Sequence, residues 1–157
     1  MKIEKALKNY KPKNEQENID LKAMLSFINK NEEPEMYPSI FFRHYRNMLK
    51  YEKIALKESQ GKVLDIGCGA GCHALYLQGK GHDVTAVEIS KKSAQVAEAR
   101  GVAKIINEDW RNLSLKNFDT VLVLMNGMGL AESPAELKIM FRKLKGFLSK
   151  SGSILID

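Results

Sequence analysis

Short apolar runs alternate with helical patterns from Gly61 onward, and this alternation restricts the fold more than any other feature of the sequence. The runs lie at residues 62–66, 83–89, 103–107, 119–125 and 153–157. Within the fourth, the stretch Thr-Val-Leu-Val-Leu shows no alternation between polar and apolar positions. Such strands are typical of parallel sheets that helices cover on both faces. The sequence therefore predicts an α/β fold built on an open, mostly parallel twisted sheet.

The segments between these runs have the periodicity and the ends of helices. We expect helices at residues 72–78, 91–100 and 134–148. Ser90 is a suitable N-cap for the second helix, and Gly101 suits the turn that ends it. The third helix has an apolar stripe opposite its cationic residues, as expected of a helix that packs on a sheet. The stripe comprises Leu137, Met140, Phe141, Leu144 and Leu148.

The first sixty residues lack this alternation and predict an amino-terminal helical extension. We therefore divide the chain into an extension at 1–60 and a Rossmann-like domain at 61–157. Scattered apolar residues at 19–28 favour one short amphipathic helix, and two prolines favour a loop at 31–38.

A second helix of the extension is expected from Ser39, its N-cap, to Lys57. Its pattern is that of a packing helix. This helix is also the best candidate for a lid over the place where a second substrate would bind, because it places aromatic and basic residues just before the domain. These residues are Phe42, Arg43, His44 and Tyr45.

Composition and charge exclude some classes of protein. No apolar run approaches the roughly 20 residues of a membrane-spanning helix, and the chain starts without an apolar leader, so we expect a soluble, cytoplasmic protein without a membrane partner. The net charge of +6 could attract nucleic acid. The basic residues are scattered over the extension and one late helix, which is typical of solvated faces. Nucleic acid is therefore a possible partner that the pattern does not favour.

Cys68, Cys72 and His73 raise the question of a metal site. The two cysteines are the only ones in the chain, and their spacing matches neither a C-x-x-C motif nor a paired zinc-ligand set. A fourth ligand is also missing from the neighbourhood. We therefore expect no metal ion.

The strongest local signal is the run Val-Leu-Asp-Ile-Gly-Cys-Gly-Ala-Gly-Cys at 63–72, an apolar strand that enters a glycine-rich turn and then a helix. Glycines accept positive φ and let the backbone approach a ligand closely. In an open α/β sheet the ligand crevice lies at the carboxyl ends of the strands. Asp65, just before the turn, would repel a phosphate but could hold a cationic amine. This residue and the altered glycine spacing weaken the alternative of a dinucleotide site.

Acidic residues follow the next two strands. Glu88 ends the second, where a carboxylate can accept both hydroxyls of a ribose. NAD would use the same carboxylate, so Glu88 by itself does not separate the two cofactors. After the third strand, Asp109 could accept from an adenine amino group, and Trp110 offers a flat apolar face. The three residues together favour a nucleoside ligand.

With these motifs in order, the segment 61–157 resembles the class I S-adenosylmethionine-dependent methyltransferases. Two further segments support the resemblance: 118–127, which looks like the family's fourth-strand motif, and 144–156, which looks like its helix-turn-strand. The resemblance implies S-adenosyl-L-methionine as cofactor and the strand order 3-2-1-4-5 in this chain. It implies these cofactor-binding residues: Asp65, Gly67, Gly69 and Gly71 at the methionine end, Glu88 at the ribose, Ile89, Asp109 and Trp110 at the adenine, and Met125 and Asn126 facing cofactor and substrate.

In the family that this sequence resembles, the sheet has seven strands. This sequence departs from this pattern because it stops just after the fifth strand. We expect this sequence to be the amino-terminal part of a longer protein, or else to form a homodimer through the exposed edge of the fifth strand. Methyl transfer needs little acid–base machinery, and no catalytic residue is assigned. The base-methylation motif Asn-Pro-Pro-Tyr is absent after the fourth strand, which argues against a DNA or amino-nitrogen acceptor but selects no replacement. We expect the acceptor to be a small molecule. An NAD-dependent oxidoreductase and a non-catalytic binding module remain as alternatives.

Overall fold

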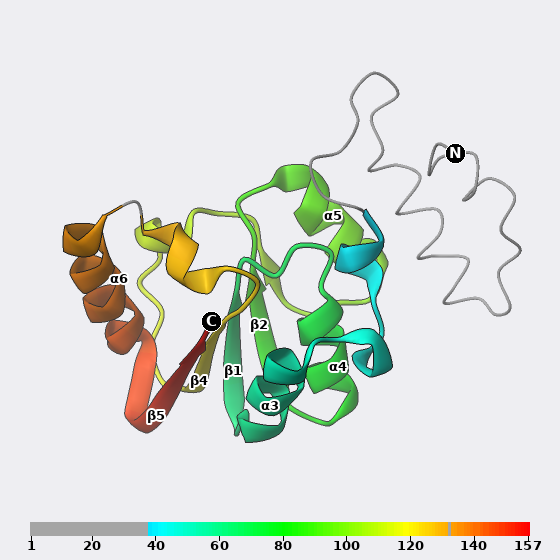
Figure 1. Cartoon of the computed structure of the whole chain (residues 1–157), viewed down its shortest axis with the longest axis horizontal. Coiled ribbons are helices and arrows are strands. Elements are labelled where there is room, and N and C mark those ends of the chain that lie inside the picture. The colour runs from blue at the N-terminus through cyan, green and yellow to red at the C-terminus, as the bar shows by residue number, and fades with distance from the viewer. Residues whose placement is uncertain (1–37, 132) are drawn as a thin grey trace, which may run out of the picture.

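A computed structural model describes residues 38–131 and 133–157 (Figure 1). The helix expected at 19–28 and most of the loop expected at 31–38 lie outside these residues. The described part contains one five-stranded sheet in the order β3-β2-β1-β4-β5, and every pair of neighbours is parallel. The predicted fold class and strand order are confirmed. The strands are β1 (Lys62–Ile66), β2 (Asp83–Val87), β3 (Ile105–Ile106), β4 (Phe118–Val123) and β5 (Leu148–Ile156).

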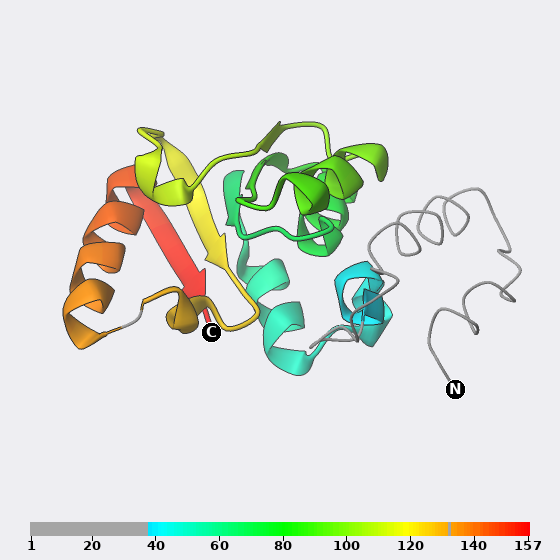
Figure 2. The same ribbon diagram turned by 90° about the horizontal axis from the view of Figure 1, so that it is seen from above.

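Helices cover both faces of this sheet (Figures 1 and 2). The side chains of Ser90 and Ser133 accept hydrogen bonds from the first turns of α5 and α6, which confirms the cap predicted at Ser90. The α-helices are α3 (Lys50–Glu58), α4 (Cys72–Gly79), α5 (Lys91–Ala99) and α6 (Pro134–Phe147). Short 3-10 turns are η1 (Pro38–Phe42), η2 (Tyr45–Asn47), η3 (Trp110–Asn112) and η4 (Gly127–Leu130). None of the helices in the described part of the chain is long and apolar enough to cross a membrane.

The core consists of two main layers that use alternate residues of the central strands. Val63 and Leu122 pack on the side of α3, α4 and α5, whereas Leu64 and Val121 pack on the side of α6. All four side chains are fully buried. Alternation along a strand sends successive side chains to opposite faces, so a run that is apolar throughout supplies both layers.

The expectation of one continuous helix at 39–57 was wrong. The backbone is extended at His44, Met48 and Leu49, so the segment forms η1, η2 and the shorter helix α3. The break lets Phe42 and Met48 bury themselves in two different apolar clusters. Tertiary packing of this kind commonly overrides local helix propensity.

Strand β5 begins earlier than predicted, at Leu148 in place of residue 153. Phe118 pairs with Leu148 and Thr120 pairs with Ser153, so the ladder contains a register shift. A Cβ at Gly152 would lie 2.7 Å from the carbonyl oxygen of Phe118, which explains why glycine stands at the irregularity. The outer edge of β5 pairs with no other strand within the described residues. Pairing of two copies along this edge stays a prediction.

Candidate functional site

The glycine-rich turn between β1 and α4 lies at the carboxyl edge of the sheet. Gly67, Gly69 and Gly71 all have positive φ, at 73°, 55° and 82°. A Cβ at Gly71 would lie 2.6 Å from Cγ2 of Val102, so the backbone of the turn packs directly against the segment after α5. A Cβ at Gly69 would lie 3.2 Å from the ring of Phe41, which places η1 over the turn.

We expect Gly71→Ala to lower the free energy of unfolding by about 2 to 4 kcal/mol, because it combines an unfavourable φ with overpacking. Urea denaturation without ligand measures this loss. Gly81→Ala is the matched control: Gly81 has a φ of +89°, but nothing lies within 4 Å of its Cβ position. In Gly81→Ala the free energy of unfolding should fall only by the cost of the unfavourable φ, about 1 to 2 kcal/mol. Equal losses in the two variants would contradict the close approach at Gly71.

Four amides of the turn already have acceptors within the protein. The N–H groups of Gly67 and Cys68 both donate to the carbonyl oxygen of Val87, at 2.9 and 3.1 Å. The N–H of Gly69 donates to Oε2 of Glu88 at 2.8 Å. The N–H of Gly71 donates to the carbonyl oxygen of Cys68 at 2.8 Å. These four N–H groups are therefore not free to bind a phosphate, which would need free N–H groups at such a turn.

Asp65 is buried at the end of β1 with 1% of its surface exposed. Its Oδ2 atom has no hydrogen-bond partner among the described residues. Burial raises the pKa of this carboxyl to about 6, against the opposing effects of His73 and the N–H of Ala74. A buried carboxylate oxygen without a partner is costly, and a ligand that donates a hydrogen bond would relieve that cost.

Glu88 and Ile89 follow β2 at the same edge of the sheet. The Glu88 carboxylate is 8% exposed and accepts from the N–H groups of Gly69 and Ser90, one on each oxygen, both at 2.8 Å. Each carboxylate oxygen can accept more than one hydrogen bond, so capacity for ligand hydroxyls remains. Ile89 is 65% exposed, which is unusual for an apolar residue directly after a buried strand. The pair therefore combines a polar anchor with an open apolar contact.

Asp109 and Trp110 lie after β3, in and beside η3. Asp109 accepts from the N–H of Arg111 and forms an ion pair with its guanidinium at 2.8 Å. The hydrogen bonds from Arg111 hold the pKa of Asp109 below its ordinary value. Trp110 is half-buried against the core layer on the side of α6. Asp109 thus already has an internal partner that a ligand would have to share.

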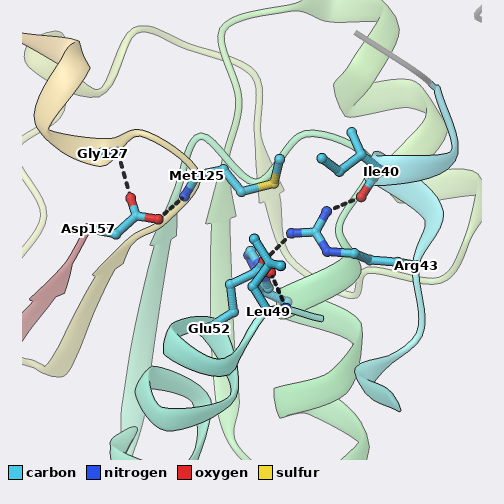
Figure 3. A network of polar contacts seen from close by, with 8 residues as sticks. Ile40, Arg43, Leu49, Glu52, Met125, Gly127 and Asp157 are labelled. Atoms are coloured by element: carbon cyan, nitrogen blue, oxygen red, sulfur yellow. Dashed lines mark hydrogen bonds and ion pairs between the residues drawn. The ribbon is translucent and has the colours of Figure 1, made fainter. Parts of the chain in front are cut away.

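Met125 and Asn126 form a strained turn after β4. Both have a φ of 67°, in the left-handed region. The carboxylate of Asp157, at the end of β5, accepts from the N–H groups of Met125 at 3.0 Å and Gly127 at 2.9 Å (Figure 3). The ends of β4 and β5 are therefore fixed to each other, and they hold Met125 and Asn126 at the carboxyl edge with the other predicted residues.

Sequence reasoning missed a buried ionic network beside this edge (Figure 3). Glu52 of α3 is fully buried, and it bonds to Arg43, to the N–H of Leu49 at 2.8 Å, and to Nε2 of His73 at 2.7 Å. The network joins the extension to the first turn of α4. One feature of the sequence could have indicated that Glu52 is buried: it lies at the same helical spacing as the apolar residues in its segment.

The charges of this network reinforce one another. Burial opposes ionisation of Glu52, but hydrogen bonds from His73, Leu49 and Arg43 outweigh it and lower its pKa to about 2. Burial also opposes protonation of His73, yet hydrogen bonds with Cys72 and Glu52, together with the charge of Asp65, raise its pKa to about 10. The pair is therefore ionised at neutral pH.

His73 is thus engaged with a carboxylate, and it does not form a ligand cluster with the two cysteines. Cys68 and Cys72 are free and buried, and burial raises the pKa of the Cys68 thiol far above its ordinary value. Residues 38–131 and 133–157 contain no group of three or more side chains placed to hold a metal ion.

Comparison with known proteins decides the family. Residues 63–152 match the family described as methyltransferase domain. The chain belongs to this methyltransferase-domain family. A SAM-dependent methyltransferase from Bacteroides fragilis, solved in complex with S-adenosyl-L-homocysteine, is 36% identical with a TM-score of 0.71, and the match covers 82% of this chain and 54% of that one.

Two curated methyltransferases are more distant relatives. The cypemycin N-terminal methyltransferase of a Streptomyces species is 29% identical over 99 residues, which are 60% of this chain and 40% of that protein. A 23S rRNA (uracil(747)-C(5))-methyltransferase of Pyrococcus abyssi is 29% identical over 95 residues, which are 56% of this chain and 23% of that protein. The chain therefore spans less than half the length of these methyltransferases. The family match over residues 63–152 contains the glycine-rich turn and the carboxyl ends of β1 to β4.

Proposed function

We propose that this domain binds S-adenosyl-L-methionine and catalyses transfer of its methyl group. The observation that carries the proposal is the unpartnered buried oxygen of Asp65, beside a glycine-rich turn whose amides are mostly occupied. Such a site suits a ligand that brings an ammonium group, as the methionine end of this cofactor does. It is poorly suited to the pyrophosphate of NAD, and the family match replaces the oxidoreductase alternative.

The nucleoside end is proposed to lie along the strand ends. The Glu88 carboxylate would accept the ribose hydroxyls, and exposed Ile89 would contact the adenine. Asp109 would accept from the adenine amino group while it keeps its ion pair with Arg111. Trp110 is proposed to lie beside the adenine, with part of its surface packed against the core.

Met125 and Asn126 are proposed to lie near the reacting sulfonium. The acceptor's nucleophile attacks the methyl carbon as the carbon–sulfur bond breaks, and S-adenosylhomocysteine is released. Because the sulfonium leaves as a neutral thioether, the protein mainly has to position the acceptor in line with that bond. No residue is assigned as a general base.

A small molecule is proposed as the methyl acceptor. The absence of a base-methylation motif after β4 argues against a DNA base as the acceptor, which is compatible with this proposal. The similarity to an rRNA methyltransferase makes RNA the second candidate, and the exposed basic residues Lys138, Arg142 and Lys145 of α6 are the feature that favours it.

Isothermal titration calorimetry with S-adenosylhomocysteine, and separately with NAD, tests the proposed cofactor. We expect saturable binding of one equivalent of S-adenosylhomocysteine and no binding of NAD. Trp110, the only tryptophan, provides a second readout, because a ligand at the adenine position should change its fluorescence. Binding of NAD alone would overturn the proposal. Failure to bind either ligand would favour a non-catalytic module.

A further inference from the structure

Arg43 belongs to the segment of the extension that passes over the glycine-rich turn. The ring of Phe41 is 3.2 Å from the Cβ position of Gly69. Arg100 bridges the same two segments, because its Nη1 donates to the carbonyl oxygens of Phe41 and Ala70. Arg43 comes two residues after this contact. In Figure 3 the side chain of Met125 extends from the end of β4 toward Ile40 and Arg43.

The guanidinium of Arg43 has partners for its two terminal nitrogens but none for its third nitrogen. Its two terminal nitrogens donate to the carbonyl oxygen of Ile40 and to Glu52. Its Nε atom is buried and has no hydrogen-bond partner among the described residues. The side chain as a whole is 8% exposed. Leaving an N–H of a buried cation without an acceptor is costly, so the site calls for a ligand group that accepts this hydrogen bond.

Only two buried side-chain polar atoms in the described residues lack a partner, Nε of Arg43 and Oδ2 of Asp65. One is a donor on a cation and the other an acceptor on a carboxylate. Glu52 and His73 connect them, since Glu52 bonds to both Arg43 and His73, and His73 interacts electrostatically with Asp65. These four charges sum to zero when all are ionised. A ligand with one ammonium and one carboxylate would satisfy both atoms and leave the sum unchanged.

We propose that Arg43 binds the carboxylate at the amino-acid end of the cofactor, opposite the ammonium group at Asp65. This inference rests on the proposed function, because it assigns one more contact within the same cofactor site. Glu52 and His73 act as positioning residues: they hold the guanidinium and keep the buried charge balanced. The extension therefore contributes directly to cofactor recognition.

The test compares two ligands on wild type and on Arg43→Gln. S-adenosylhomocysteine has both the ammonium and the carboxylate, whereas its decarboxylated analogue keeps the amine and lacks the carboxylate. We expect Arg43→Gln to weaken S-adenosylhomocysteine on the order of 10- to 100-fold and to leave the analogue nearly unchanged. The wild type should lose a similar factor when the carboxylate is removed from the ligand. Such coupling between a side chain and a ligand group is the signature of direct contact.

The matched control is Arg46→Gln, because Arg46 lies three residues further on with an exposed side chain. This variant should bind both ligands as wild type does. General damage to the fold would weaken both ligands equally in Arg43→Gln, and that outcome would overturn the inference. Equal affinity of wild type and Arg43→Gln for S-adenosylhomocysteine would overturn it too. Failure of wild type to bind S-adenosylhomocysteine would instead reject the proposed function.

Discussion

Asp65→Asn is expected to stabilise the ligand-free domain and, in the same change, to remove most of its affinity for S-adenosylhomocysteine. The buried carboxyl has a pKa of about 6 against an ordinary value of 3.8, so above pH 6 its ionisation costs the folded state up to about 3 kcal/mol. Asparagine keeps an acceptor for the N–H of Ala74 without the charge. Loss of the ammonium partner should weaken binding on the order of 100-fold.

The wild type should show the same effect as a function of pH. Because the pKa of Asp65 is raised, the cost of its ionisation develops between pH 3.8 and about 6 and is fully present above that range. The proposed contact with the cofactor's ammonium group requires the ionised form. Affinity for S-adenosylhomocysteine should therefore fall by about tenfold per pH unit below pH 6, and Asp65→Asn should remove this dependence.

Urea denaturation and calorimetry at pH 5 to 8 measure both effects. Asp83→Asn is a suitable control, because the Asp83 side chain is 49% exposed at the start of β2 and forms a surface ion pair with Lys104. That change should alter stability by less than about 1 kcal/mol and leave affinity unchanged. An Asp65→Asn variant that binds S-adenosylhomocysteine as tightly as wild type would contradict the role given to Asp65.

Glu52→Gln should have the largest effect on stability of any single change considered in this domain. It leaves the guanidinium of Arg43 and the imidazolium of His73 buried without the carboxylate between them. Removing one partner from a buried ionic network costs about 3 to 5 kcal/mol. The free energy of unfolding in urea at pH 6 measures this loss.

The size of the Glu52→Gln effect should depend on pH. The pKa of His73 is raised to about 10, so the stability from its protonated form is complete below pH 6.5 and is lost as the pH rises toward 10. The difference between wild type and variant should therefore shrink over this range. Glu58→Gln, an exposed change on the same helix, should cost less than about 0.5 kcal/mol at every pH. A difference that stays constant with pH would reject the ionised pair.

Sequence patterns with local causes were sufficient for most of the sheet. The bounds of β1 agree with the prediction, since an apolar run followed by a glycine turn leaves little choice of where the strand ends. The cap at Ser90 depends on its own side chain and the next turn, and it was predicted correctly. The strand order followed from the family resemblance, because parallel apolar runs alone do not determine which strands are neighbours.

What could not be predicted depends on contacts between distant residues. The break in the helix expected at 39–57 reflects the separate burial of Phe42 and Met48, in clusters formed by elements that follow later in the chain. The ion pair of Glu52 with His73 joins residues 21 positions apart, and each would be expected at the surface by its type. The left-handed turn at Met125 depends on Asp157 in the same way.

The occupied amides of the glycine-rich turn limit how this domain could be re-engineered for another cofactor. Exchanging Glu88 would release only the N–H of Gly69, because Gly67 and Cys68 donate to the main-chain carbonyl of Val87, which no substitution removes. A designer who wants a phosphate-binding loop here must therefore rebuild the backbone path between β1 and β2. The main chain itself keeps the N–H groups of Gly67 and Cys68 from a phosphate, and side-chain libraries at the turn should not free them.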